Sequence, residues 1–301
     1  MSDKKQCPLC SGQELKESWF GATQYNGLVF EYFECVSCGS LVCTPMPDTM
    51  TLQKMYGAEY LAVNIKATEA DSPKDPEFVL STLRKAIKPG LFLDYGCGEG
   101  DLLVSAQKLG WDVIGFEYDP KVAIEVASQT GCQVFSDESM LFDDHGKPKV
   151  DVLHLGDVIE HLTDLVHQFP KILQIIKPGG LILAQGPLEA GPNLFTQVLK
   201  LSKKGKSKQV ASMPPYHVIL ATVNGQRKFF ENHGLEQVEY KVTEEDWPAP
   251  SRLIKPILSR NSVLWGIRKI SQAVSALSFG TMGNRYFYAG RVVQANNIVP
   301  K

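Results

Sequence analysis

The sequence has no run of eighteen apolar residues and no excess of basic charge, since 31 lysines and arginines face 33 acids for a formal net charge of -2. Without a long apolar run, it offers no candidate for a membrane-spanning helix. The slightly negative net charge gives no overall attraction to nucleic acid or to an anionic membrane. Its first ten residues also lack an apolar signal region, so we expect a cytoplasmic protein. The charge balance disfavours nucleic acid as a partner.

The chain has seven cysteines, and four of them form two CxxC pairs, which suit a reducing cytosol and a metal site better than disulfides. Cys7 and Cys10 make the first pair, Cys35 and Cys38 make the second, and 24 residues lie between the pairs. Two tight turns that each present two thiolates satisfy tetrahedral metal coordination. We therefore predict that residues 1–45 form a zinc ribbon around a structural Zn²⁺, with redox-active cysteines as the alternative.

A glycine-rich turn follows the first strongly apolar strand of the chain. Residues 91–93 (LFL) indicate a buried parallel strand that ends at Asp94. Glycines then stand at alternating positions, namely Gly96, Gly98 and Gly100. Glycine at these positions allows a sharp turn and lets a ligand approach the backbone closely. Residues 101–110 indicate a helix that ends at a glycine, so the pattern is that of a strand, a ligand-binding turn and a helix.

The next strand, expected at residues 112–116, ends in Glu117, whose carboxylate can accept hydrogen bonds from both hydroxyls of a ribose. The third glycine of the dinucleotide fingerprint is missing, because Asp101 occupies its place. Glu99 and Asp101 also place negative charge where a pyrophosphate would bind. A cofactor with an adenosyl group, a cationic centre and an ammonium fits better, so the pattern favours S-adenosylmethionine.

These residues resemble the motifs of class I S-adenosylmethionine-dependent methyltransferases. DYGCGEG (94–100) is similar to the first family motif, and Glu117, DVLHLGDVIEHL (151–162) and KPGGLILAQGP (177–187) follow in family order. The resemblance covers roughly residues 90 to 240. Tyr95 is a departure, because the family more often has Val or Ile there. The resemblance implies a set of cofactor-binding residues: Asp94, Gly96, Cys97, Gly98, Gly100, Glu117, Tyr118, Asp137 and Asp157.

Strands and helices alternate through this region, which favours an α/β fold with a parallel sheet covered on both faces. We expect strands near 91–95, 112–117, 132–136, 150–156 and 181–186. The family topology implies a sixth strand near 235–242 and a last, antiparallel strand near 286–294. The expected fold is therefore a Rossmann-like, doubly wound, seven-stranded sheet with an N-terminal zinc ribbon.

The chain divides into three predicted parts. Residues 1–45 are the ribbon, 46–89 a helical bridge or lid, and 90–301 the methyltransferase core with a helical insertion at about 247–284. In some relatives the bridge closes over the cofactor, which would bring Tyr56 or Tyr60 to it. Aromatic packing between modules is the alternative.

The insertion carries an amphipathic pattern over residues 262–279. Apolar side chains recur at four- and three-residue steps, which places them on one face of a helix; they are Val263, Ile267, Ile270, Val274 and Leu277. Arg260, Arg268 and Lys269 lie outside this stripe. We expect it to pack against the core or a second subunit, with contact to a membrane surface as the alternative.

Methyl transfer from a sulfonium is an in-line displacement that needs alignment and, for a hydroxyl acceptor, a base. Asp157 follows the fourth strand, at the edge where doubly wound folds bind ligands. His161 comes one helical turn later, and His217 follows a rigid Pro-Pro in PPYHV (214–218). These three are the catalytic candidates. A structural or orienting role is the alternative for each histidine.

The expected acceptor is a small molecule, because CVSCGSLVCTPMPDTMTLQKMYGAEYL (35–61) resembles methyltransferases of sugar and polysaccharide biosynthesis. The lysine-rich segment KLSKKGKSK (200–208) is either a solvated loop or a clamp for phosphate groups on that acceptor. Three alternatives stay open: a quinone-type O-methyltransferase, a ribosomal RNA methyltransferase, and a non-catalytic cofactor-binding adaptor. The second pair ends in Cys38 instead of histidine, which argues against the RNA enzymes.

Overall fold

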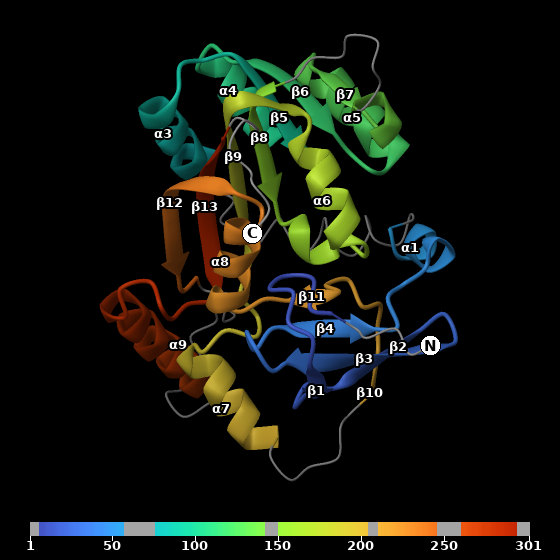
Figure 1. The fold of residues 1–301 in the computed structure, drawn as a ribbon, viewed down its shortest axis with the longest axis vertical. Helices are drawn as coiled ribbons and strands as arrows, with labels where there is room; N and C mark the ends of the chain where they lie inside the picture. The colour runs from blue at the N-terminus through green and yellow to red at the C-terminus, as the bar shows by residue number, and fades with distance from the viewer. Residues whose placement is uncertain (1–5, 57–75, 142–149, 204–209, 246–259, 294–301) are drawn as a thin grey trace. The chain divides into compact units, whose positions relative to one another are not determined.

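A computed structural model describes residues 6–56, 76–141, 150–203, 210–245 and 260–293 of the chain (Figure 1). The chain forms two compact units. The first comprises Met1–Ser72, Pro187–Phe229 and Lys241–Tyr286, and the second Pro73–Gly186, Phe230–Tyr240 and Phe287–Lys301. These units gather segments that are distant in sequence, whereas the predicted domain boundaries follow the chain and stay a prediction. Tyr60, residues 204–208 and the start of the predicted insertion lie outside the described residues.

Most of the second unit is a seven-stranded, mainly parallel sheet. The order of its strands is β12-β13-β9-β8-β5-β6-β7. Parallel pairing joins β5 to β6 and β8, β6 to β7, and β8 to β9. The strands are β5 (Leu91–Tyr95), β6 (Asp112–Phe116), β7 (Gln133–Phe135), β8 (Val150–Gly156), β9 (Ile176–Pro187), β12 (Leu235–Thr243) and β13 (Arg285–Val292). The predicted Rossmann-like sheet is thus confirmed, with each strand close to its predicted position.

Helices cover this sheet because each presents an apolar face to it. They are α3 (Pro76–Ala86), α4 (Asp101–Lys108), α5 (Pro120–Thr130) and α6 (Leu165–Leu173), with the 3-10 turns η1 (Glu138–Leu141) and η2 (Ile159–His161). Leu83 of α3, Phe92 of β5 and Trp111 belong to one buried cluster. Both ends of α5 are capped, since the Asp119 side chain accepts a hydrogen bond from the Lys121 N–H and Gly131 ends the helix at φ 71°.

The first unit is built on a six-stranded sheet that the sequence pattern did not predict. Its strands follow the order β10-β2-β3-β4-β11, and β1 pairs with β3. They are β1 (Leu15–Glu17), β2 (Ala22–Tyr25), β3 (Leu28–Cys35), β4 (Leu41–Thr44), β10 (Val210–Ser212) and β11 (Ile219–Leu220). The cysteine-bearing hairpins of residues 7–44 therefore share one sheet with residues 210–220. The helices are α1 (Thr49–Met55), α7 (Leu194–Lys203), α9 (Arg260–Leu277) and the start of α8 (Val223–Asn232).

Helix α9 is confirmed as an element, but its buried face differs from the predicted one. Ile270 and Leu277 of the apolar stripe are 57% and 76% exposed. Arg268, Ser271 and Ser275 are buried instead. Ile270 and Leu277 therefore do not pack against the described part of the core, and packing of the stripe against a second subunit stays a prediction. The polar face is buried because it meets a partner that periodicity does not reveal, namely the carboxylate of Glu244.

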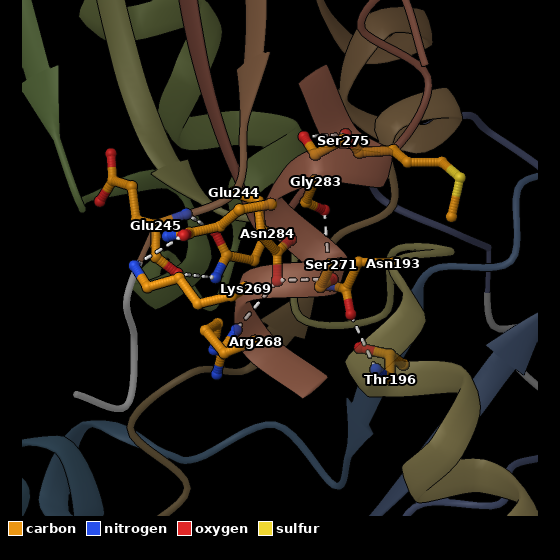
Figure 2. A network of polar contacts seen from close by, with 12 residues as sticks. Asn193, Thr196, Glu244, Glu245, Arg268, Lys269, Ser271, Ser275, Gly283 and Asn284 are labelled. Atoms are coloured by element: carbon orange, nitrogen blue, oxygen red, sulfur yellow. Dashed lines mark hydrogen bonds and ion pairs between the residues drawn. The ribbon is translucent and has the colours of Figure 1, made fainter. Parts of the chain in front are cut away.

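Glu244 is fully buried just after β12 and binds α9 through two polar contacts (Figure 2). Its Oε1 accepts hydrogen bonds from Arg268 Nη1 at 2.9 Å and from Ser271 Oγ at 3.1 Å. Both charged side chains are almost inaccessible, with exposures of 5% and 0%. Burying such a pair costs free energy because both charges lose their water. Removing one partner, however, strongly destabilises the fold, because the other charge is left buried without a counter-charge. The pair therefore selects the polar face of α9 for burial.

We predict that Glu244→Ala destabilises the protein by about 3–5 kcal/mol, because it leaves the guanidinium of Arg268 buried without its carboxylate. Such a loss lowers the melting temperature by on the order of 10 °C, measurable by circular dichroism. Glu245→Ala is the matched control. It removes a half-exposed ion pair with Arg285 of 3.3 Å, and partly exposed pairs contribute about 0–1 kcal/mol. Equal melting temperatures for the two variants would contradict the prediction.

Candidate functional site

The glycine turn after β5 adopts backbone conformations that side chains rarely tolerate. Gly96, Gly98 and Gly100 have φ values of 82°, 51° and 81°. A Cβ at Gly96 would lie 3.0 Å from Val158 Cγ2, and one at Gly100 would lie 2.7 Å from Val126 Cγ1. A Cβ at Gly98 would meet nothing within 4 Å. Neighbouring side chains therefore pack closely against Gly96 and Gly100, whereas the backbone of Gly98 is open to a ligand.

Glu117 lies directly beside this turn. Its Oε2 accepts a hydrogen bond from the Gly98 N–H at 3.0 Å, and its Oε1 accepts one from the Asp119 N–H at 3.4 Å. Burial raises the pKa of Glu117, while these two N–H donors act in the opposite direction. The carboxylate is thus held in place by backbone donors and keeps further lone pairs for the hydroxyls of a ribose.

Cys97 turns its side chain into the protein, not toward a ligand. Its thiol is buried in a cluster with Leu103, Val126 and Cys132. A Cβ at Gly115 on the neighbouring strand would lie 2.9 Å from the Cys97 sulfur. Burial, and to a smaller extent the nearby carboxylates of Asp94 and Glu117, raises the pKa of this thiol, so it stays protonated and unreactive. Only the backbone of Cys97 is available to a cofactor.

Asp94, at the end of β5, forms a buried pair with His154 of β8. The distance between Asp94 Oδ1 and His154 Nδ1 is 2.7 Å, and both side chains are almost fully buried. His154 is thus a hydrogen-bonded residue of the core. Because Asp94 is engaged by this pair, it supports the turn from behind, and its direct contact with a cofactor stays a prediction.

The carboxyl end of β8 carries Asp157 in a left-handed conformation, with φ 54°. This conformation is uncommon for a residue other than glycine and often marks a functional position. The Asp157 N–H donates to the Gln185 carbonyl at 2.9 Å, which fixes the residue at the strand end. His161 follows in η2 and is partly exposed. Both residues lie where the sequence analysis expects them, after the fourth parallel strand.

Tyr118 and Asp137 follow the carboxyl ends of the neighbouring strands β6 and β7. Tyr118, directly after Glu117, is 53% exposed. Asp137 is exposed after β7, and its Oδ1 accepts a hydrogen bond from the Ser139 N–H at 2.9 Å. That bond caps η1, so Asp137 has a local structural role beside the predicted one at the adenine.

The four paired cysteines come together in the first unit. Their sulfur atoms all lie within 4.8 Å of one another. Cys7 and Cys38 sulfurs are 3.7 Å apart, and those of Cys10 and Cys35 are 3.5 Å apart. A zinc ion with four Zn–S bonds of about 2.3 Å holds its sulfurs roughly 3.8 Å apart. The cluster thus fits a tetrahedral metal ion, and none of the four cysteines forms a disulfide.

Residues from the second half of the chain hold this cluster in place. Thr222 Oγ1 donates to the Cys38 carbonyl at 2.7 Å, and the Thr222 N–H donates to Ser40 Oγ at 3.0 Å. A Cβ at Gly225 would lie 2.2 Å from Ser40 Oγ. The first turn of α8 therefore packs directly on the turn that carries the second CxxC pair.

His217 lies in the loop between β10 and β11, also in the first unit. Its Nδ1 is 2.7 Å from Glu189 Oε2, and its carbonyl accepts a hydrogen bond from the Tyr32 hydroxyl at 2.8 Å. Next to it, the Val218 carbonyl accepts a hydrogen bond from the Cys43 N–H at 2.9 Å. The cysteine-bearing hairpins thus hold the backbone of the loop, and Glu189 orients the imidazole.

Glu189 is a residue that the sequence analysis missed. It stands two positions after β9, and an acid at the carboxyl end of a parallel strand was the one available signal. Tyr56 is placed in the same unit, with its hydroxyl 3.5 Å from the Tyr216 carbonyl and its ring near that of Tyr216. His217 belongs to the first unit, whereas Asp157 and His161 belong to the second.

Comparison with known families agrees with the glycine turn and the sheet order. Residues 73–245, more than half of the chain, match the model of a family described as "Methyltransferase domain". The chain belongs to the methyltransferase domain family. The expected enzyme class, an S-adenosylmethionine-dependent methyltransferase, is thereby confirmed, and the α/β core described above is its methyltransferase domain.

Curated relatives of this methyltransferase match part of their length. "Ribosomal protein L11 methyltransferase" from Pasteurella multocida is 31% identical over 100 residues, covering 32% of this chain and 33% of that protein. The protein of the same name from Burkholderia vietnamiensis is 32% identical over 146 residues, covering 48% and 45%. The chain therefore spans about a third to a half of the length of these relatives.

Among solved structures, a chain of the complex between the Haloferax volcanii Trm112 methyltransferase activator and a methyltransferase is similar, with a TM-score of 0.51. The identity is 15%, and the match covers 79% of this methyltransferase and 97% of that chain. At this identity the likeness bears on the fold alone, where it agrees with the sheet described above.

Proposed function

We propose that this methyltransferase transfers a methyl group from S-adenosylmethionine to a small-molecule acceptor, a sugar or an intermediate of glycan synthesis. The assignment of S-adenosylmethionine as the cofactor rests on one observation, the carboxylate of Glu117 beside the open backbone of Gly98. In this proposal Glu117 binds the ribose hydroxyls, and the turn from Gly96 to Gly100 passes under the cofactor. Tyr118 and Asp137 flank the adenine, and Asp157 faces the methionine part.

We infer that His217 removes the proton from an acceptor hydroxyl. The carboxylate of Glu189 keeps a proton on Nδ1 and leaves Nε2 as the basic atom, as an acid does for a catalytic histidine in many enzymes. When the acceptor oxygen attacks the methyl carbon, the C–S bond breaks and S-adenosylhomocysteine leaves. The acceptor proton moves to His217, and Glu189 stabilises the imidazolium. His161 and Asp157 are the second candidates for this role.

We predict that His217→Asn lowers kcat by about 10²–10⁴, the usual contribution of a general base. Glu189→Gln is expected to lower kcat less and to alter the pH profile, because an amide replaces the carboxylate that orients the imidazole of His217. The measurement is a pH profile of kcat/KM with the identified acceptor.

The matched control for this pair is His167→Asn. His167 and Asp164 form a second histidine–carboxylate contact of 2.7 Å, but both side chains are mostly exposed on the surface of the second unit. This variant should leave the pH profile unchanged. An unaltered profile in Glu189→Gln would remove Glu189 from the proposed role, and unchanged kcat in His217→Asn would remove His217.

We further propose that Cys7, Cys10, Cys35 and Cys38 bind one structural Zn²⁺. The sulfur distances fit tetrahedral coordination, and the neighbouring sheet carries the loop of His217. Zinc would supply folding free energy and no chemistry of its own. Its effect on catalysis would act through the position of that loop.

The proposal is tested in two stages. Calorimetric titration with S-adenosylmethionine and S-adenosylhomocysteine, with NAD as the control, examines the cofactor. Transfer of a labelled methyl group to nucleotide sugars then examines the acceptor, and the lysines of residues 200–208 favour a phosphate-bearing one. A label that enters quinone precursors or ribosomal RNA would favour those alternatives. Binding of both cofactors without transfer to any acceptor would favour the adaptor.

A protein acceptor is the second candidate. The curated relatives are named for ribosomal protein L11, and they match this methyltransferase over 100 to 146 residues. The same labelled assay with purified ribosomal proteins distinguishes the two candidates, because a protein acceptor carries the label into an acid-insoluble band.

A further inference from the structure

The helices α7 and α9 of the first unit pack against each other and expose large apolar side chains. Three of these belong to α9 or follow it directly, and two belong to α7. With their exposed fractions they are Ile270 (57%), Leu277 (76%), Phe279 (97%), Val198 (41%) and Leu201 (70%). Single exposed apolar residues are ordinary, but a helical pair that carries five of them indicates an interaction surface.

On α9 the exposed residues share one face. Ile270 and Leu277 are seven residues apart, about two helical turns, and the exposed Ala273 lies between them. The opposite face carries Arg268 and Ser271, which Glu244 binds inside the unit. The helix is therefore amphipathic with its polar face buried, and no residue in the described part of the chain covers its apolar face at Ile270 and Leu277.

Phe279 extends this surface beyond the end of α9. It is almost completely exposed, and its backbone has φ 51°, a conformation that a bulky residue seldom adopts. Gly280 follows with φ 77°. The turn thus exposes an aromatic ring to solvent and strains the backbone to do so. Packing within the unit does not account for this strain, because the ring packs against almost nothing there.

The charge of the surrounding segments has one sign. Residues 190–230, which contain α7, hold seven lysines and arginines and no acid. Residues 247–301, which contain α9, hold eight lysines and arginines and again no acid. The net charge of -2 conceals this segregation, because all 33 acids lie elsewhere in the sequence. The apolar surface is therefore carried by two basic segments.

We propose that the α7–α9 pair lies on the surface of an anionic lipid bilayer. Ile270, Leu277 and Phe279 would enter the boundary between headgroups and acyl chains, and the exposed Lys269 of α9 and the partly exposed Lys200 of α7 would lie near the lipid phosphates. Among the described helices, none is long and apolar enough to cross a membrane, so the contact is a peripheral one. Such a contact would bring the methyltransferase to acceptors that are held in or at a membrane.

A second copy of the chain fits this surface less well. A twofold interface brings the same patch of both copies together. Here that would place two acid-free basic segments opposite each other, and like charges across an interface are unfavourable. An anionic bilayer offers the complementary charge and an apolar interior at the same time.

The test is flotation of the full chain with vesicles of phosphatidylcholine alone or of phosphatidylcholine and phosphatidylglycerol at 3:1. We expect binding to the anionic vesicles that decreases with salt. The triple variant Ile270→Ser, Leu277→Ser, Phe279→Ser should bind at least about tenfold more weakly. The control variant Ile124→Ser, Val166→Ser removes side chains of the second unit that are 72% and 54% exposed, and it should bind normally.

Three results would overturn the proposal: no binding of the wild type to anionic vesicles, equal loss in the control variant, or a wild-type dimer in sedimentation velocity that the triple variant abolishes. The last result would assign the surface to a second copy. If the triple variant does not keep the wild-type melting temperature, Phe279→Ser alone replaces it. That residue lies outside α9, and a loss of binding of about threefold is then expected.

Discussion

Replacing Glu117 by alanine is expected to lower the affinity for S-adenosylmethionine by at least about tenfold. The carboxylate would accept hydrogen bonds from two ribose hydroxyls, and each hydrogen bond to a charged group contributes about 1.5–3 kcal/mol. The N–H of Gly98, which now binds Glu117 Oε2 at 3.0 Å, would also lose its acceptor. Calorimetric titration with S-adenosylmethionine and S-adenosylhomocysteine measures the loss for both ligands.

The same variant should keep its fold. Burial raises the pKa of Glu117, so the folded state binds the proton of this carboxyl more tightly than the unfolded state. Its contribution to stability is then greatest in acid and is lost as the pH rises through the raised pKa. At neutral pH the ionised carboxylate is a cost, and neither Glu117→Ala nor Glu117→Gln should melt much earlier than the wild type.

Glu125→Ala on the neighbouring helix α5 is the control for cofactor binding. Glu125 is exposed, and its carboxylate accepts a hydrogen bond from Gln129. This variant should bind both ligands with wild-type affinity. If Glu117→Ala also did so, Glu117 would not bind the ribose, and the proposed orientation of the cofactor would have to be abandoned.

Removal of the metal is expected to have the second large effect. We predict one zinc ion per chain in the wild type and none after Cys38→Ser. Structural zinc contributes on the order of 10 kcal/mol in small zinc-bound folds, so its loss should unfold the hairpins of β1 to β4. The loop of His217 pairs with β4 through Ile219 and Leu220, and it should lose its position as well. Metal analysis measures the zinc content, and limited proteolysis within residues 210–220 measures whether the loop keeps its position.

Cofactor binding separates this effect from general unfolding. The glycine turn and Glu117 belong to the second unit, so Cys38→Ser should retain S-adenosylmethionine binding while methyl transfer falls by at least about a hundredfold. Cys132→Ser is the matched control, because Cys132 is a buried thiol of the second unit without a second cysteine at metal-binding spacing. A wild-type protein that holds no metal would overturn the zinc proposal.

The cofactor turn could be predicted from the sequence because its determinants are local. Its three parts lie within 27 residues: a buried strand, glycines that require positive φ, and an acid at the end of the next strand. Each part can be recognised directly from the residue types. The two CxxC pairs are equally local. The helix α9 was found for the same reason, but its orientation was not, because periodicity identifies an apolar stripe without showing what covers it.

The residue pattern by itself determined the order of strands and helices in the seven-stranded sheet, the turn around Gly98 and the pairing of the cysteines in the first unit. Tertiary structure alone decided that Glu189 orients His217, that the cysteine-bearing hairpins carry the His217 loop, and that Glu244 buries the polar face of α9. The physical reason is sequence separation. Tyr32 and His217 stand 185 residues apart, and a contact between such residues depends on the closed fold, so it leaves no periodic signal in either segment.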